Sequence, residues 1–88
     1  MSKVALITGA TRGIGRQIAI TLSKEGYDIA LNYRKENEEL DSIKKEIKEN
    51  KVECLAVKGD VSNFDDCEKF VKQVIEKFGK VDVLVNNA

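Results

Sequence analysis

The sequence predicts an α/β fold in which four parallel strands form a doubly wound sheet with three helices. Short apolar runs alternate with longer stretches whose apolar residues recur every three or four positions, the pattern of strands alternating with helices. A glycine-rich turn follows the first apolar run. The 88 residues contain no low-complexity linker, so we treat residues 1–88 as a single domain. Such alternation implies a parallel sheet with right-handed crossovers.

The first strand is expected over residues 4–7 and leads directly into a glycine turn, residues 8–15. Its glycines are spaced G-x-x-x-G-x-G, and they leave room for a phosphate beside the unpaired N–H groups that begin the next helix. The turn lacks the lysine of a P-loop, which weakens an NTPase interpretation and favours a pyrophosphate ligand. The alternative is a strand-to-helix turn whose glycines serve packing alone.

The first helix is expected over residues 13–25, with an apolar face on which Ile14, Ile18 and Leu22 recur every four residues. Gly26 stands where a left-handed C-terminal cap is expected. A second, mostly apolar strand should follow immediately over residues 28–33.

The charged stretch of residues 34–51 predicts a surface helix. Leu40, Ile43 and Ile47 form a thin apolar stripe within it, and the charges are interpreted as the solvated face. Asn50 is the expected stop, and strand character returns over residues 52–57.

The third helix is predicted to begin with Ser62 as its N-cap and Asp65 in its first turn, and to end at Gly79. Its apolar residues fall on one face at helical spacing, which core packing explains without any cofactor. That face comprises Phe64, Cys67, Phe70, Val71, Val74, Ile75 and Phe78.

The fourth strand is expected over residues 81–85. In the usual order of such folds the strands lie 3-2-1-4, so the chain reverses direction between the first and fourth strands. The first two helices should then share one face of the sheet, with the third on the other, and the fourth strand should be an open apolar edge. The carboxyl ends of all four strands meet at one rim, where a crevice for a ligand is expected.

Composition excludes several function classes. Fifteen basic and fifteen acidic residues cancel, and no basic run carries interleaved aromatics, so we expect no nucleic-acid surface. Without histidine, a Ser/His/Asp triad is impossible and zinc lacks its usual nitrogen ligands. Cys54 and Cys67 have no C-x-x-C spacing and are interpreted as reduced core thiols. No secretory leader or membrane-spanning run is recognised, which favours a cytoplasmic protein and no membrane partner.

The glycine turn carries a family resemblance. Its sequence, TGATRGIG, resembles the TGxxxGxG cofactor motif of the short-chain dehydrogenase/reductase family. Its individual residues are most similar to those of the 3-oxoacyl-acyl-carrier-protein reductases. The resemblance covers all 88 residues and implies a partial, N-terminal Rossmann-like dinucleotide-binding domain. It also implies that Gly9, Gly13 and Gly15 let the pyrophosphate and the adenosine ribose approach the backbone.

The end of the second strand bears on the choice of cofactor. Members that use NAD carry an acidic residue there for the ribose 2′-hydroxyl. Here the chain reads Asn32-Tyr33-Arg34-Lys35, with no carboxylate before residue 36. Arg34 and Arg12 would therefore contact the 2′-phosphate of NADP(H), which is the predicted cofactor. The alternative is that Arg34 is merely the first charge of a polar helix.

Two further segments resemble the family's adenine pocket. Asp60 and Val61 match its D-V pair, although Asp60 alone is also explained as a turn or capping carboxylate. The end of the chain, Asn86-Asn87-Ala88, matches the start of the NNAG motif, whose role is partly structural. The cofactor-binding residues expected on this basis are Gly9, Thr11, Arg12, Gly13, Ile14, Gly15, Asn32, Tyr33, Arg34, Asp60, Val61, Asn87 and Ala88.

The resemblance implies NADPH-dependent reduction of a carbonyl, most similar to the 3-oxoacyl thioester on acyl carrier protein that is reduced in fatty acid synthesis. The family's chemistry uses a serine, a Tyr-x-x-x-Lys pair and an asparagine, and neither Tyr27 nor Tyr33 has a lysine four positions on. We therefore assign no catalytic residue within these 88 residues and expect the isolated chain to be inactive. A non-catalytic NADP(H)-binding module and an inactive incomplete fragment remain open, and the complete protein is expected to be a homo-oligomer.

Overall fold

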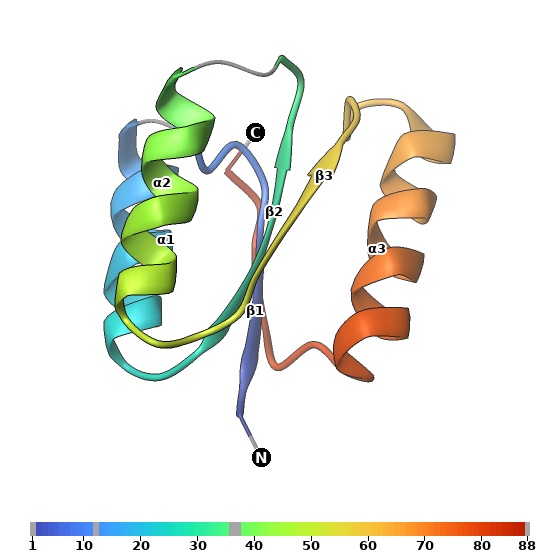
Figure 1. The fold of residues 1–88 in the computed structure, drawn as a ribbon. Helices are drawn as coiled ribbons and strands as arrows, with labels where there is room; N and C mark the ends of the chain where they lie inside the picture. Colours follow the sequence, from blue (N-terminus) through green and yellow to red (C-terminus); the bar gives the residue numbers. More distant parts are fainter. Residues whose placement is uncertain (1, 12, 36–37, 88) are drawn as a thin grey trace.

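The computed structural model describes residues 2–11, 13–35 and 38–87. Four parallel strands form one sheet in the order β3-β2-β1-β4, which confirms the predicted topology (Figure 1). In chain order the elements are β1 (Val4–Ile7), α1 (Gly13–Lys24), β2 (Asp28–Tyr33), α2 (Glu38–Glu49), β3 (Cys54–Lys58), α3 (Phe64–Phe78) and β4 (Val83–Val85).

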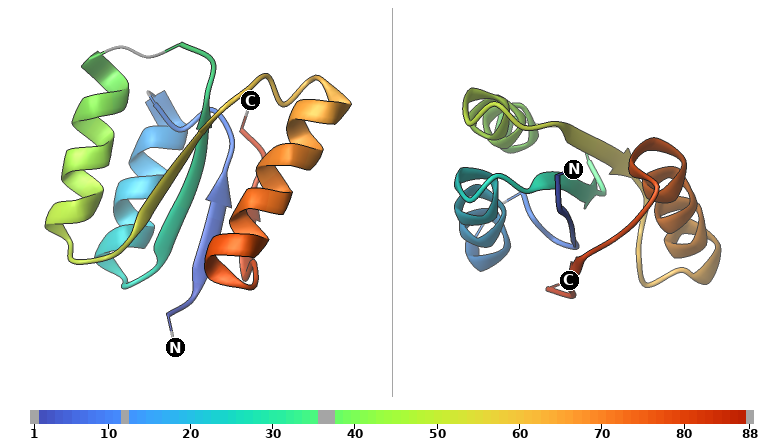
Figure 2. Two further views of the ribbon diagram at one scale, coloured as in Figure 1. Left: turned by 45° about the vertical axis from the view of Figure 1, so that its right-hand side comes forward. Right: turned by 90° about the horizontal axis from the view of Figure 1, so that it is seen from below.

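The sheet is covered on both faces. Successive residues of a strand point to opposite faces, so Ala5 and Ile7 of β1 pack toward α1 and α2, whereas Val4 and Leu6 pack toward α3. All four residues are buried. Figure 2 shows α1 and α2 together on one side of the sheet and α3 on the other, as predicted.

Helix α2 forms where the charged stretch predicted it. Leu40, Ile43 and Ile47 are all buried against the sheet, which confirms the thin apolar stripe. The helix ends just before Asn50, although the left-handed residue beyond it is Lys51, with φ of 63°. The Asn50 amide donates to Ser23 Oγ at 2.8 Å and so ties the end of α2 to α1.

The prediction that Ser62 caps α3 is wrong. Asn63 is the N-cap, and its Oδ1 accepts hydrogen bonds from the N–H groups of Asp65 at 2.9 Å and Asp66 at 3.3 Å. Ser62 lies outside the helix, where its N–H and hydroxyl donate to Asp60 Oδ1 at 3.0 Å and 2.7 Å. The helix therefore begins one residue later than expected, and it ends at the left-handed Gly79 as predicted.

The predicted apolar face of α3 is only partly in the core. Phe70 and Val74 are buried, but Phe64 is 77% exposed and both Val71 and Ile75 are more than two-fifths exposed. Among the described residues α3 is the one helix on its face of the sheet, so only the narrow line that touches the strands is covered. Periodicity cannot show how much of an apolar face has a neighbour.

Other departures are small and lie at element ends. Helix α1 ends at Lys24 rather than at residue 25, and Gly26 adopts the predicted left-handed conformation. Ile14 was expected on the apolar face of α1, but it lies at the start of the helix and is 73% exposed. Strand β3 spans Cys54–Lys58 rather than 52–57, and β4 spans Val83–Val85 rather than 81–85.

Asp82 explains the short fourth strand. Its Oδ2 accepts from Val4 N at 2.7 Å while its own N–H donates to Val4 O at 2.8 Å, so a side chain makes one of the first links between β4 and β1. The Val4 hydrogen bond, together with Lys80, holds the pKa of Asp82 below its ordinary value.

This lowered pKa predicts an acid-sensitive link. A carboxyl group with a folded pKa below its unfolded pKa stabilises the fold at neutral pH, and this contribution is lost as the pH falls through the folded value. The variant Asp82→Asn keeps an oxygen to accept from Val4 N but does not titrate. In urea unfolding, the wild-type chain should lose more stability than Asp82→Asn between neutral pH and values below 3.8. Equal losses in both chains would contradict the assignment.

The two cysteines are free and only half-buried, so neither lies fully in the core as the sequence interpretation expected. Burial raises the pKa of the Cys54 thiol to about 11, partly opposed by Lys44 and Lys48. Over residues 2–11, 13–35 and 38–87, no group of three or more His, Cys, Asp or Glu side chains is arranged to hold a metal ion. Within the same ranges no helix has the length and apolar character required to cross a bilayer.

Candidate functional site

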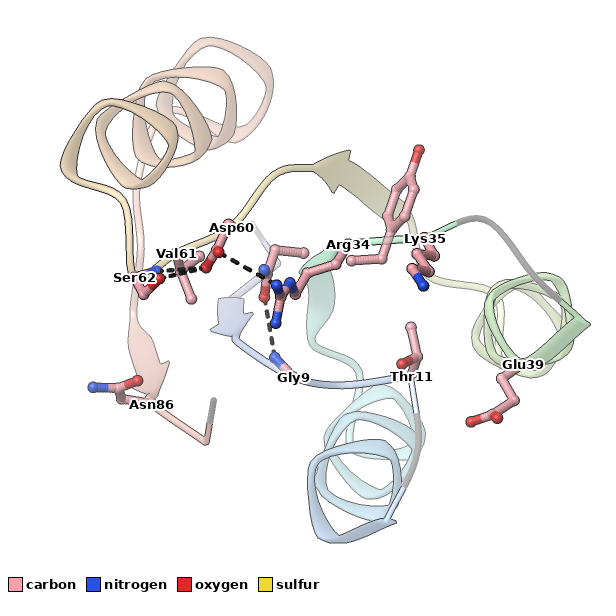
Figure 3. A pocket seen from close by; sticks show the side chains of 11 residues that line it. Gly9, Thr11, Arg34, Lys35, Glu39, Asp60, Val61, Ser62 and Asn86 are labelled. Carbon is pink, nitrogen blue, oxygen red and sulfur yellow. Dashed lines mark hydrogen bonds and ion pairs between the residues drawn. The ribbon is translucent and has the colours of Figure 1, made fainter.

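A groove of about 980 Å³ lies at the carboxyl ends of the strands, where the predicted crevice was expected. Five segments contribute to it: the turn between β1 and α1, the end of β2, the first turn of α2, the loop after β3 and the residues after β4 (Figure 3). Parallel strands bring these ends to one edge because every crossover returns the chain to the opposite edge. The lining residues are Gly9, Thr11, Asn32, Tyr33, Arg34, Lys35, Glu39, Asp60, Val61, Ser62 and Asn86.

The glycine turn is closely packed against the first turn of α1. Gly9 and Gly13 adopt left-handed φ angles of 63° and 65°, which glycine accepts without strain. A Cβ atom on Gly15 would lie 2.3 Å from Gly9 O and 2.6 Å from Asn87 Nδ2, so no side chain fits there. A Cβ on Gly13 would meet nothing within 4 Å, which leaves open space at the N-terminus of α1.

Hydrogen bonds from the end of β4 hold one side of this turn. Thr8 N donates to Val85 O at 3.0 Å, and Asn87 N donates to Thr8 Oγ1 at 2.8 Å. The Asn87 amide group also donates to Gly9 O at 3.3 Å. These hydrogen bonds from Asn87 to the glycine turn support the expected, partly structural role of the Asn86-Asn87 segment.

Asn32 holds the other side of the turn. Its side chain is buried near the end of β2, where Oδ1 accepts from Gly9 N at 3.0 Å and Nδ2 donates to Gly59 O at 3.2 Å. One amide therefore joins the glycine turn to the loop that follows β3.

Opposite charges face each other across the groove. The Arg34 guanidinium lies 3.6 Å from Asp60 Oδ2, and the Arg34 side chain is 75% exposed. Hydrogen bonds from the Ser62 hydroxyl and Ser62 N–H, helped by Arg34, lower the pKa of Asp60. The Asp60 N–H donates in turn to Asp66 Oδ2 at 2.9 Å, which anchors the loop to α3. Asp60 is thus an ionised group in a held conformation.

The structure brings seven of the expected site residues together along the groove: Gly9, Thr11, Asn32, Tyr33, Arg34, Asp60 and Val61. Gly13, Ile14, Gly15 and Asn87 lie in or against the glycine turn but do not line the groove. Arg12 and Ala88 lie outside the described residues.

Four lining residues were not among the expected cofactor ligands. Three of them could have been found from their neighbours in the sequence. Lys35 follows Arg34 directly, and Asn86 begins the Asn-Asn segment. Ser62 lies two residues after Asp60, at the spacing of an Asx turn. Glu39 comes from α2, and only the packing of that helix beside the groove places it there.

Sequence comparison identifies the family. The family model described as short chain dehydrogenase matches residues 3–88. The chain belongs to the short-chain dehydrogenase family. This membership confirms the resemblance carried by the glycine turn, and the family's fold agrees with the observed strand order.

Curated and solved members of the short-chain dehydrogenase family extend well beyond this chain. It is 47% identical over 88 residues to the 3-oxoacyl-acyl-carrier-protein reductase FabG of Staphylococcus epidermidis, covering 100% of this chain and 36% of that protein. The structure of actinorhodin polyketide ketoreductase with NADPH is 47% identical, with a TM-score of 0.89, covering 99% of this chain and 33% of that one. The chain thus spans about a third of the length of these relatives.

A third relative was solved with the other nicotinamide cofactor. Carveol dehydrogenase from Mycobacterium avium in complex with NAD is 30% identical, with a TM-score of 0.89, covering 98% of this chain and 35% of that one. The glycine turn beside the groove suits a ligand of this class, because a phosphate needs a site free of side chains and a Cβ on Gly13 would meet nothing within 4 Å. The family therefore supports an NAD(P) site here, and the choice between the two cofactors depends on the groove's own residues.

Proposed function

We propose that this chain forms the cofactor-binding part of an NADP(H)-dependent carbonyl reductase. The observation that carries this proposal is the pair of cations, Arg34 and Lys35, lining the groove directly after β2. A site specific for NAD carries a carboxylate at this position, which accepts from the ribose 2′-hydroxyl and repels a 2′-phosphate. Two cations in its place favour the phosphate through charge-assisted hydrogen bonds.

The other site residues divide between the two ends of the groove. Gly9, Thr11 and Gly13 would admit the pyrophosphate to the N-terminus of α1, where unpaired N–H groups favour an anion. Asp60 and Val61 would receive the adenine, with the Asp60 carboxylate accepting from its amino group. When bound, the cofactor supplies a hydride to a carbonyl carbon, and the chain's own residues bind and orient it.

The proposed substrate of the complete protein is a 3-oxoacyl thioester on acyl carrier protein. Support comes from the 47% identity to a reductase of that name and the equal identity to a polyketide ketoreductase. We also propose a cytoplasmic location, in keeping with the two free cysteines, and a homo-oligomer that covers exposed apolar residues such as Leu84 of β4.

A second candidate is an NADP(H)-binding module without turnover. It is favoured by the sequence itself, since Leu31 and Asn37 stand four positions after Tyr27 and Tyr33, where the family's pair requires lysine. The two candidates share the cofactor site and differ only in turnover.

Titration of the 88-residue chain with NADPH and NADH tests the cofactor. We expect NADPH to bind about tenfold or more tightly than NADH, because one charge-assisted hydrogen bond to the 2′-phosphate is worth at least that ratio. Equal affinities would refute the NADP(H) preference, and binding of neither would refute the cofactor site. Addition of an acetoacetyl thioester should cause no NADPH oxidation, and measurable oxidation would instead place catalysis within these residues.

A further inference from the structure

We propose that Asn32 is a positioning residue that couples the two ends of the groove and does not itself bind the cofactor. The proposal concerns how the glycine turn and the loop after β3 are held at a set separation. Its consequence for NADP(H) rests on the function proposed above, whereas the coupling of the two loops does not.

Both polar atoms of the Asn32 amide are used within the protein. The residue is 4% exposed, and it accepts from Gly9 N at 3.0 Å and donates to Gly59 O at 3.2 Å. These two partners follow β1 and β3, the strands on either side of β2. A side chain from the middle strand thus bridges the loops of both neighbours.

The bridge also occupies one N–H group that a phosphate would otherwise use. Gly9 N–H donates to Asn32, and Gly9 C=O accepts from Asn87, so both backbone groups of this glycine have protein partners. We infer that the pyrophosphate depends on N–H groups farther along the turn, toward α1. Asn32 would then act by fixing the position of Gly9 at the start of the glycine turn.

At its other end the bridge reaches the charged part of the groove. Gly59 directly precedes Asp60, whose carboxylate pairs with Arg34 at 3.6 Å. The path from Gly9 through Asn32 and Gly59 to Asp60 therefore connects the phosphate cradle to the proposed adenine pocket. A displacement of the glycine turn or of the loop after β3 would therefore be transmitted to the other through the Asn32 amide.

The chemistry of the bridge requires a side-chain amide. An aspartate in this position has the acceptor for Gly9 N–H but, when ionised, no donor for Gly59 O. An alanine removes both hydrogen bonds and leaves the Gly9 N–H and the Gly59 C=O without this partner in a part-buried place. The variants Asn32→Asp and Asn32→Ala therefore separate one half of the bridge from the whole.

Hydrogen exchange of the Gly9 amide, measured by NMR without cofactor, tests the bridge itself. We expect Asn32→Ala to speed this exchange by about tenfold or more, and Asn32→Asp to keep it close to the wild-type rate. Asn50→Ala is the matched control, because it also removes a part-buried asparagine hydrogen bond but lies far from the groove. Unchanged exchange in Asn32→Ala would overturn the proposal.

Adenosine 2′-monophosphate tests the coupling, since it can fill the Asp60 and Arg34 end and has no 5′-phosphate that would reach the glycine turn. Its binding should shift the Gly9 amide resonance in the wild-type chain and in Asn50→Ala, but not in Asn32→Ala. Both Asn32 variants should weaken NADPH binding by about tenfold, while Asn50→Ala lowers only the thermal midpoint. Unweakened NADPH binding, or a retained Gly9 shift in Asn32→Ala, would overturn the proposal. Failure of the wild-type chain to bind NADPH would refute the proposed function, and the exchange result would still decide the bridge.

Discussion

Replacing Gly15 with alanine is expected to lower the free energy of unfolding by about 2 kcal/mol and to weaken NADPH binding by at least about tenfold. Helix propensity alone predicts the opposite sign, since alanine stabilises a helix by about 0.5–1 kcal/mol relative to glycine. The steric effect should win because the added Cβ would lie 2.3 Å from Gly9 O, a backbone atom that cannot rotate away. Urea unfolding and NADPH titration measure the two effects.

The double variant Gly15→Ala/Asn87→Ala provides the control. Removing the Asn87 side chain relieves the contact at 2.6 Å but leaves the contact with Gly9 O in place. The double variant should therefore remain destabilised and should still bind NADPH weakly. An alanine at residue 15 that leaves stability and binding unchanged would show that the glycine turn is looser than its geometry implies.

The second large effect is expected at Arg34. Its replacement by alanine should weaken NADPH binding by about 10- to 100-fold, the worth of a charge-assisted hydrogen bond to phosphate, and should leave NADH binding nearly unchanged. The structure places the guanidinium in the groove, within 3.6 Å of Asp60, and largely exposed to an incoming ligand. Parallel titrations with the two cofactors measure the change in preference.

Lys58→Ala is the matched control for charge. Lys58 is exposed at the end of β3 and is not among the residues that line the groove, so the variant changes net charge by the same amount without touching the site. It should bind both cofactors as the wild type does. If Arg34→Ala weakened NADPH and NADH equally, Arg34 would support the fold of the groove instead of selecting the 2′-phosphate.

Local patterns were sufficient for the order of the elements and the position of the groove. The alternation of apolar runs with helical stripes predicted the sheet, and the glycine turn marked the edge where the groove lies, because both signals depend on residues close together in the chain. The prediction that Leu40, Ile43 and Ile47 form a buried stripe was also correct, because their spacing is a local signal and all three residues of α2 are buried.

Tertiary structure decided which apolar and polar groups acquired partners. Phe64 and Ile14 follow helical periodicity as well as Phe70 does, yet only Phe70 is covered, because burial depends on what the fold places beside a face. Asn32 has no local signal for its bridge, whose partners Gly9 and Gly59 lie 23 and 27 positions away. The spacing of nearby residues thus determines which helices and strands the chain prefers to form. Contacts across the sheet form only after the strands align, because alignment brings distant backbone groups within hydrogen-bonding distance.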